Sequence, residues 1–192
     1  MEMKIYRQID TLTNAEKEAA QAYRSESGFF HLAAQADHSM ALAEFEDYGR
    51  FALSGKPLAL KAATSSRYEL TTDVTLYSGH GSGTGVLGAL GHSDVARFKG
   101  MTWRYRGFTS ASPVKEIAEK FVWTRAKSAG DVPVLLEFRL AAGFRLLPMQ
   151  VLGSDFEVEF LLPSNVPFTI IEASRVTIGD VSNVLHLVLK PA

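Results

Sequence analysis

The pattern of apolar and polar positions predicts helices in the first third of the chain. Residues 13–16 read Thr-Asn-Ala-Glu, a capping box in which a hydroxyl and a Glu three positions later start a helix. We expect this helix to run to about Tyr23 and to end at Ser27-Gly28. Apolar residues at helical spacing within residues 41–52 predict a second helix, which Gly55-Lys56-Pro57 breaks.

Beyond residue 73 the pattern changes to short runs rich in β-forming residues. The predicted strands are residues 74–77, 101–110, 132–140, 144–152, 156–162, 168–173 and 184–189. Turns are expected at Gly143, Gly153, Pro163 and Gly179.

One helix is predicted among the strands. It begins after Ser112 as a cap and Pro113 in its first turn. Ile117, Ala118 and Phe121 give it an apolar side. Helices followed by many strands indicate an α+β fold with sheets packed on each other. The length of 192 residues fits a single domain, with a helical part at 1–57 and a strand-rich core at 73–192.

Composition and charge narrow the possible functions. The formal net charge of −1 and the scattered basic residues give no electrostatic case for nucleic acid binding. The chain has no cysteine, which excludes disulfides, thiolate metal sites and a cysteine nucleophile. It also lacks an apolar run of about 18 residues, so we expect no membrane span. The first residues lack the apolar core of a signal peptide.

Glycines and histidines offer a weaker signal. Residues 79–88 formally match a dinucleotide fingerprint, but no acidic residue follows about 20 positions later, and a surface loop is the stronger interpretation. No two histidines have the spacing of a helical metal site. His186 lies among leucines and is expected to be a hydrogen-bonded core residue. His80 stays a candidate because it follows a strand inside the glycine-rich segment.

Two polar motifs carry the strongest functional signal. Residues 108–112 read Phe-Thr-Ser-Ala-Ser, and residues 157–163 read Glu-Val-Glu-Phe-Leu-Leu-Pro. Alternate side chains of a strand share a face, so Glu157 and Glu159 should point one way. The apolar residues expected on the opposite, core-facing side are Phe156, Val158, Phe160 and Leu162. With the hydroxyls of the upstream strand, the acids suggest the floor of a cleft.

Taken in order, these motifs and the stretch Leu-Tyr-Ser-Gly at residues 76–79 resemble the mono-ADP-ribosyltransferases of the Arg–Ser–Glu class. That class includes bacterial toxins and injected effectors as well as vertebrate ecto-enzymes. The resemblance covers nearly the whole chain. It implies N-terminal helices followed by a split β-sandwich of two packed, mainly antiparallel sheets.

The resemblance also implies roles for single residues. Glu159 matches the catalytic glutamate, which holds the 2′-hydroxyl of the nicotinamide ribose. Glu157 matches the acid that positions the acceptor side chain. In family members with Glu at this position, the acceptor is arginine. Ser110 matches the serine that orients the catalytic glutamate, and Ser112 closes the same motif on the cofactor side. Tyr77, Ser78 and Gly79 match the strand beside NAD⁺.

One position departs from the family pattern. Family members carry Arg where this chain has Ser78, and that Arg grips the NAD⁺ phosphates through paired donors. His80 could replace it, as a histidine serves in the diphtheria-toxin-like branch. Arg104 or Arg106 could instead reach the phosphates from the strand before the Ser motif. A third interpretation is an inactive relative that no longer binds NAD⁺.

The resemblance therefore implies an enzyme that transfers ADP-ribose from NAD⁺, with no metal, to a side chain of a target protein, with arginine as the expected acceptor. It implies a bacterial effector or toxin that modifies a protein of a host or rival cell. Such a protein stays in the cytoplasm before export, leaves without a readable signal and acts in the cytoplasm of the target cell. No nucleic acid or membrane partner is expected. The alternatives are an inactive binding module, an NAD⁺ glycohydrolase and a structural β-sandwich.

Overall fold

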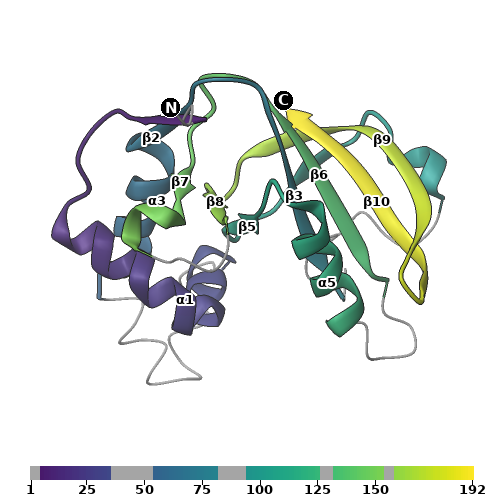
Figure 1. Cartoon of the computed structure of the whole chain (residues 1–192), viewed down its shortest axis with the longest axis horizontal. Helices are drawn as coiled ribbons and strands as arrows, with labels where there is room; N and C mark the ends of the chain where they lie inside the picture. The colour runs from purple at the N-terminus through teal and green to yellow at the C-terminus, as the bar shows by residue number, and fades with distance from the viewer. Residues whose placement is uncertain (1–4, 36–53, 82–93, 126–131, 154–157) are drawn as a thin grey trace. The chain divides into compact units, whose positions relative to one another are not determined.

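The computed structural model describes residues 5–35, 54–81, 94–125, 132–153 and 158–192 (Figure 1). The chain forms two compact units, each built from three segments. The first unit comprises Met1–Thr72, Arg106–Thr109 and Ala142–Asn165, and the second comprises Asp73–Tyr105, Ser110–Ala141 and Val166–Ala192. The predicted helix within residues 41–52, most of the glycine-rich segment, and Phe156 and Glu157 lie outside the described residues. The single-domain assignment stays a prediction.

Two helices are described in the first unit, α1 (Asn14–Gln35) and α3 (Lys56–Ser66), and they pack against each other. The predicted end of α1 at Ser27-Gly28 is wrong, because the helix continues through Gly28. One interior glycine costs only about 1 kcal/mol, which the rest of a long helix can offset. Helix α3 was not predicted. Gly55 precedes it with a φ of 77°, and a proline in its first turn is compatible with the unpaired amides there.

The strands of the first unit are short. Strand β1 (Tyr6–Gln8) pairs antiparallel with β2 (Tyr68–Leu70), and β7 (Leu147–Pro148) pairs antiparallel with β8 (Phe160–Leu162). The latter sheet has the order β5–β8–β7, and β5 (Thr109–Ala111) starts at the last residue of the unit's middle segment. After β7 the chain forms the 3₁₀ helix η3 (Met149–Leu152).

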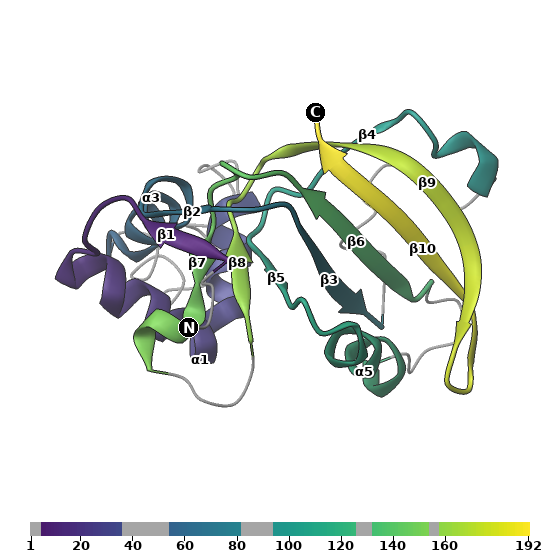
Figure 2. The same ribbon diagram turned by 45° about the horizontal axis from the view of Figure 1, so that its top comes forward.

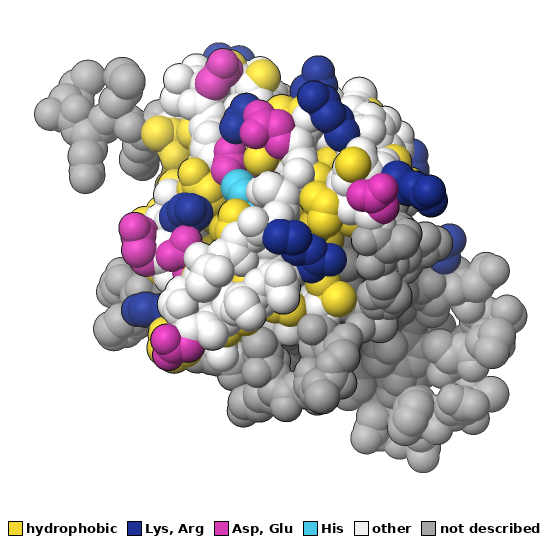
Figure 3. Space-filling view, turned by 90° about the vertical axis from the view of Figure 1, so that its right-hand side faces the viewer, with side chains coloured by type: hydrophobic (Ala, Val, Ile, Leu, Met, Phe, Trp, Pro, Cys, Tyr) yellow, Lys and Arg dark blue, Asp and Glu magenta, His cyan; other side chains and the backbone are white. Residues whose placement is uncertain are grey.

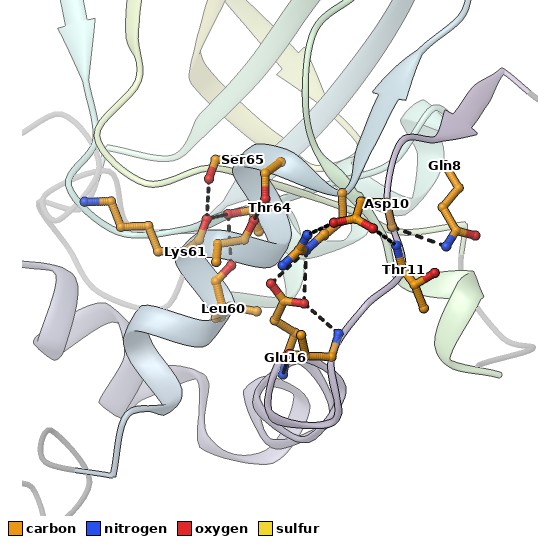
Figure 4. A network of polar contacts seen from close by, with 12 residues as sticks. Gln8, Asp10, Thr11, Glu16, Leu60, Lys61, Thr64 and Ser65 are labelled. Carbon is orange, nitrogen blue, oxygen red and sulfur yellow. Dashed lines mark hydrogen bonds and ion pairs between the residues drawn. The ribbon is translucent and has the colours of Figure 1, made fainter.

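A partly buried ion-pair network ties the start of α1 to the end of α3 (Figure 4). The predicted capping box is confirmed: the Thr13 amide donates to Glu16 Oε2 at 2.7 Å, and the Glu16 amide donates to Thr13 Oγ1 at 3.2 Å. Arg67 Nε donates to both oxygens of Glu16, at 2.9 and 3.1 Å, and its Nη1 contacts Asp10. The Glu16 side chain is only 4% exposed, so its charge depends on Arg67 for compensation.

We expect the change Arg67→Met to destabilise the protein by about 3 kcal/mol, because removing one partner leaves a buried carboxylate uncompensated. Urea unfolding measures this effect. Arg97→Met is the control, since Arg97 and Asp94 are 79% and 59% exposed and 3.9 Å apart, and such pairs contribute about 0–1 kcal/mol. Equal losses for both variants would contradict the assigned role of Arg67.

Two tyrosines make the first unit sensitive to alkaline pH. Burial raises the pKa of Tyr6 above its ordinary value of about 10, and burial with the nearby Tyr6 phenol raises the pKa of Tyr68. The unfolded chain loses these protons first, so the free energy of unfolding should fall as pH rises above about 10. Urea unfolding at a series of pH values tests this. The double variant Tyr6→Phe, Tyr68→Phe should show a smaller decrease, and an unchanged slope would refute the assignment.

The second unit is built on a five-stranded sheet of order β3–β6–β10–β9–β4 (Figure 2). Its strands are β3 (Val74–His80), β4 (Thr102–Arg104), β6 (Val134–Leu140), β9 (Pro167–Ile178) and β10 (Val181–Pro191). Strands β6 and β10 are parallel, and the other neighbours are antiparallel. The 3₁₀ helix η2 (Val95–Arg97) precedes β4.

Helix α5 (Lys115–Arg125) lies against one face of this sheet, beside β3 (Figure 1). Its fully buried side chains are Ala118 and Val122, which pack in a cluster with Leu135, Val184 and Ile178. Ile117 and Phe121, predicted as its apolar side, are only half-buried. The opposite face of the sheet carries an aromatic cluster, Trp103, Phe138 and Phe168.

Charged side chains lie on the same face of the sheet as α5. His186 Nε2 lies 3.2 Å from Glu137 Oε2, so its expected hydrogen bond is confirmed. Its expected place in the core is wrong, because the side chain is only half-buried. Arg139 Nε donates to Glu137 at 3.0 Å, and its Nη1 donates to Glu172 at 3.3 Å. On the face of the molecule drawn in Figure 3, acidic and basic side chains likewise lie side by side around a histidine.

The predicted α+β class is confirmed, with mainly antiparallel sheets. The turns at Gly143, Gly153 and Gly179 are also confirmed, with φ values of 88°, 80° and 56°. The predicted strand at 101–110 is wrong as a single element, because the chain passes from the second unit to the first at residue 106 and forms β4 and β5 separately. In the described part of the chain, no helix is long and apolar enough to cross a membrane.

Candidate functional site

Two of the three sequence motifs meet at the edge of the second unit's sheet. The Tyr77 amide donates to the Ser112 carbonyl at 2.7 Å, and the Ser112 amide donates to the Tyr77 carbonyl at 2.9 Å. These paired bonds bring the Tyr-Ser-Gly stretch of β3 directly beside the second serine of the Ser motif. The other edge of β3 is paired with β6 along its whole length. Strand β3 is therefore held on both sides at the candidate site.

Gly79 lets α5 approach the backbone of β3. A Cβ atom at this position would lie 1.8 Å from the carbonyl oxygen of Ala118 and 2.7 Å from its carbonyl carbon. Both are backbone atoms of α5, so no side-chain movement could relieve the overlap. A glycine inside a strand often marks such a close approach. The structure therefore gives Gly79 a packing role, and its predicted contact with NAD⁺ stays a prediction.

Ser78 lies on the opposite face of β3 from α5 and is 5% exposed. Its Oγ atom lies 3.1 Å from Nε2 of His80, which is two residues along the same strand and on the same face. Neighbouring positions on this face hold the fully buried Leu76 and Leu136. The pair is thus a polar contact on an apolar surface. Sequence reasoning singled out both residues but missed their contact, which the i, i+2 spacing on a strand could have indicated.

The two serines of the Ser motif have different environments. Ser112 is 5% exposed, and its Oγ accepts a hydrogen bond from the Val114 amide at 3.1 Å, just before α5 begins. Helix α5 begins only at Lys115, so the predicted start, with Ser112 as the cap and Pro113 in the first turn, is wrong by two residues. Ser110 lies on β5 and is exposed. The contacts of both serines with NAD⁺ and of Ser110 with the catalytic glutamate stay predictions.

Glu159 belongs to the first unit, whereas Ser110 belongs to the second. Glu159 is partly buried and precedes β8, and its carbonyl oxygen accepts the Met149 amide at 2.9 Å. The predicted alternation around it is wrong in two places. Val158, expected in the core, is 43% exposed, while Leu161, expected on the acidic face, is 0% exposed. All three residues of β8 are buried, so both faces of this strand are covered, and its two edges are paired with β5 and β7.

The residues proposed to replace the family arginine lie on different elements of the fold. Arg104 is exposed on β4, at the opposite edge of the sheet from β3. Four inter-strand spacings of about 4.8 Å, roughly 19 Å, separate these edges along the sheet. Arg106 is exposed and belongs to the first unit. Within the second unit, the structure places His80, and not Arg104, beside Ser78.

Comparison with known proteins gives a consistent result for the fold. No family model matches the sequence, and no curated protein matches it. Among solved structures, Plx2a, an ADP-ribosyltransferase toxin from Paenibacillus larvae, is similar over 94% of this chain and 87% of its own, with 18% identity and a TM-score of 0.67. This chain has the fold of the ADP-ribosyltransferase toxins.

Two further ADP-ribosyltransferases show a similar extent of likeness. One from Clostridium botulinum matches over 94% of this chain and 87% of its own, with 14% identity and a TM-score of 0.64. The other is Vis, a toxin from Vibrio splendidus. Its structure in complex with agmatine matches over 96% of this chain and 77% of its own, with 22% identity and a TM-score of 0.66. The family resemblance inferred from the motifs is therefore confirmed at the level of the ADP-ribosyltransferase fold.

Proposed function

We propose that the chain is a mono-ADP-ribosyltransferase that moves ADP-ribose from NAD⁺ to an arginine side chain of a protein. The similarity to ADP-ribosyltransferase toxins over 94% of the chain is the main support. The order of the motifs adds to it, because the serines and the glutamate pair stand where the resemblance requires them.

The proposed chemistry is a substitution at the anomeric carbon of the nicotinamide ribose. The glycosidic C–N bond breaks, its electron pair leaves with nicotinamide, and the ribose develops positive charge. The Glu159 carboxylate stabilises that charge, as carboxylates do in glycoside cleavage. Ser110 orients Glu159. Glu157 holds the guanidinium acceptor and takes its proton as the new C–N bond forms.

A guanidinium acceptor has support beyond the motif. The Vis structure is a complex with agmatine, a small amine that carries the same guanidinium group as arginine. We therefore propose agmatine as the first acceptor to test. It is small enough to react without a specific protein docking surface.

The decisive experiment incubates the protein with NAD⁺ and agmatine and measures the products by mass spectrometry. ADP-ribosyl-agmatine would support the transferase. Free ADP-ribose without the conjugate would identify an NAD⁺ glycohydrolase instead. Calorimetry with NAD⁺ tests for an inactive binding module. The absence of both products and of NAD⁺ binding would identify such a module. This alternative is favoured by the buried Ser78, which stands in place of the family arginine.

The proposed biological role is that of a bacterial effector or toxin, because the similar structures are toxins. In this role the chain is secreted or injected and modifies a protein in the cytoplasm of a host or rival cell. Mass spectrometry of proteins from exposed cells would identify the modified target. If the protein modifies agmatine but no ADP-ribosylated peptides are found in exposed cells, the proposed role as an effector or toxin fails and the enzymatic activity stands.

A further inference from the structure

Gln150 lies in the first unit, next to the backbone that carries Glu159. Strands β7 and β8 pair antiparallel, with Leu147 opposite Leu161, and they run side by side in Figure 2. The Met149 amide continues this pairing by donating to the Glu159 carbonyl at 2.9 Å. Gln150 follows Met149 in η3, so its backbone is one residue away from the bond that joins η3 to Glu159.

The backbone of η3 is held on both sides of Gln150. Met149 is fully buried in the apolar cluster that also contains residues of α1, and Leu152 packs against the same cluster. Gly153 has a φ of 80°, and its amide donates to the Gln150 carbonyl at 3.0 Å. Any rearrangement of Gln150 is therefore expected in its side chain rather than in its backbone.

The side-chain oxygen of Gln150 is buried without a hydrogen bond. Among the described residues, no donor pairs with its Oε1 atom. Nearly all buried polar groups in proteins are paired, because an unpaired group loses its hydration and gains no bond in return. The side chain as a whole is only half-buried. Rotation about its own bonds can therefore bring Oε1 to the surface, and this movement breaks no hydrogen bond of that atom.

The chemistry of this oxygen favours a ligand that is rich in donors. An amide oxygen only accepts hydrogen bonds, whereas a guanidinium group only donates them, through five N–H groups. Phosphate oxygens, which carry the charge of NAD⁺, only accept hydrogen bonds and cannot pair with an amide oxygen. Of the two substrates in the proposed reaction, the guanidinium acceptor is therefore the better match.

We propose that Gln150 is a specificity-determining residue, whose Oε1 turns outward and accepts a hydrogen bond from an N–H of the guanidinium substrate. This inference rests on the proposed function. Gln150 then adds a neutral acceptor to the carboxylates of Glu157 and Glu159. It also explains why η3 carries an amide where an apolar side chain of the same length would leave no buried oxygen unpaired.

The change Gln150→Met removes the acceptor oxygen and keeps the length of the side chain. We expect the KM for agmatine to rise roughly tenfold, because a hydrogen bond to a charged group is lost. The KM for NAD⁺ should stay the same. The midpoint of urea unfolding should not fall, since the buried oxygen has no hydrogen bond to lose. An unchanged KM for agmatine, or a change confined to the KM for NAD⁺, would overturn the inference.

Two further variants make the test specific. Gln150→Glu keeps an acceptor oxygen and removes the amide N–H groups, so its KM for agmatine should not exceed that of wild type. A rise in this KM would show that the N–H groups bind the substrate, and it would contradict the proposed contact. Gln8→Met makes the same chemical change as Gln150→Met at an exposed position of β1 in the same unit, and it should leave both KM values unchanged.

The proposed function and this inference fail separately. NMR titration of the full chain with agmatine measures binding without any reaction, and wild type should bind more tightly than Gln150→Met. If wild type binds agmatine with this difference but forms no ADP-ribosyl-agmatine, the transferase proposal fails and the contact remains. If wild type forms the conjugate and both proteins bind agmatine equally, the inference fails and the transferase remains. If wild type neither binds nor modifies agmatine, both fail.

Discussion

The change Glu159→Gln should lower the rate of ADP-ribosyl transfer by about 100–1,000-fold, the usual effect of removing one electrostatic partner of the transition state. Gln keeps the size of the side chain but removes the negative charge that would stabilise the developing ribose cation. The affinity for NAD⁺ should change far less, because the bound ground state lacks the full ribose charge. Agmatine modification under single-turnover conditions measures the chemical step directly.

Glu18→Gln is the matched control for this prediction. This variant also replaces a carboxylate by an amide, but on the exposed side of α1, within the same unit as Glu159. We expect it to keep the full rate of transfer. If Glu159→Gln also transfers ADP-ribose at the wild-type rate, the carboxylate of Glu159 has no part in the reaction.

Gly79→Ala should destabilise the protein by about 3 kcal/mol or more, because the new Cβ overlaps the backbone of Ala118. Relief requires that α5 moves away from β3, which would open the cluster around Ala118 and Val122. The free energy of unfolding in urea measures the loss. If the variant is too unstable to purify, the amount of soluble protein relative to the control reports the same effect.

Gly143→Ala is the control that distinguishes the effect of steric overlap at Gly79 from the effect of backbone strain at a glycine. Gly143 has a φ of 88° and no atoms near its would-be Cβ, so alanine there adds strain of about 1–2 kcal/mol but no overlap. We expect Gly79→Ala to lower the free energy of unfolding clearly more than Gly143→Ala does. An equal or smaller loss at Gly79 would show that α5 can shift at little cost.

Local signals in the sequence predicted part of the fold well. The capping box at residues 13–16 is satisfied by side chains close in sequence, so tertiary contacts are not needed to recognise it. Glycine turns are similarly local, because positive φ values favour glycine whatever surrounds them. The α+β class followed from the change of periodicity near residue 73, where the second unit also begins.

Elements that depend on distant contacts were predicted poorly. The apolar run at residues 144–152 forms the short β7 and then η3, and a continuous apolar run does not distinguish a strand from a helix. The strand at 101–110 is divided because the chain changes units, which composition does not reveal. All three residues of β8 are buried, so both faces of this strand are covered and the alternation expected around Glu159 does not apply.

The candidate site was predicted as a set of motifs and not as a geometry. The sequence identified Tyr77, Ser78 and Ser112, and the structure adds the paired bonds that join Tyr77 to Ser112. Arg104 looked equivalent to His80 as a substitute for the missing arginine, since the two cannot be ranked by distance along the chain. The strand order ranks them, because β3 and β4 occupy opposite edges of the sheet.

The position of β10 has a consequence for how the protein is made. This last strand lies in the middle of its sheet, between β6 and β9. A ribosome delivers β10 after the other four strands of this sheet, so the sheet cannot form in full before β10 has emerged. Deleting β10 would remove the centre of the sheet rather than its margin.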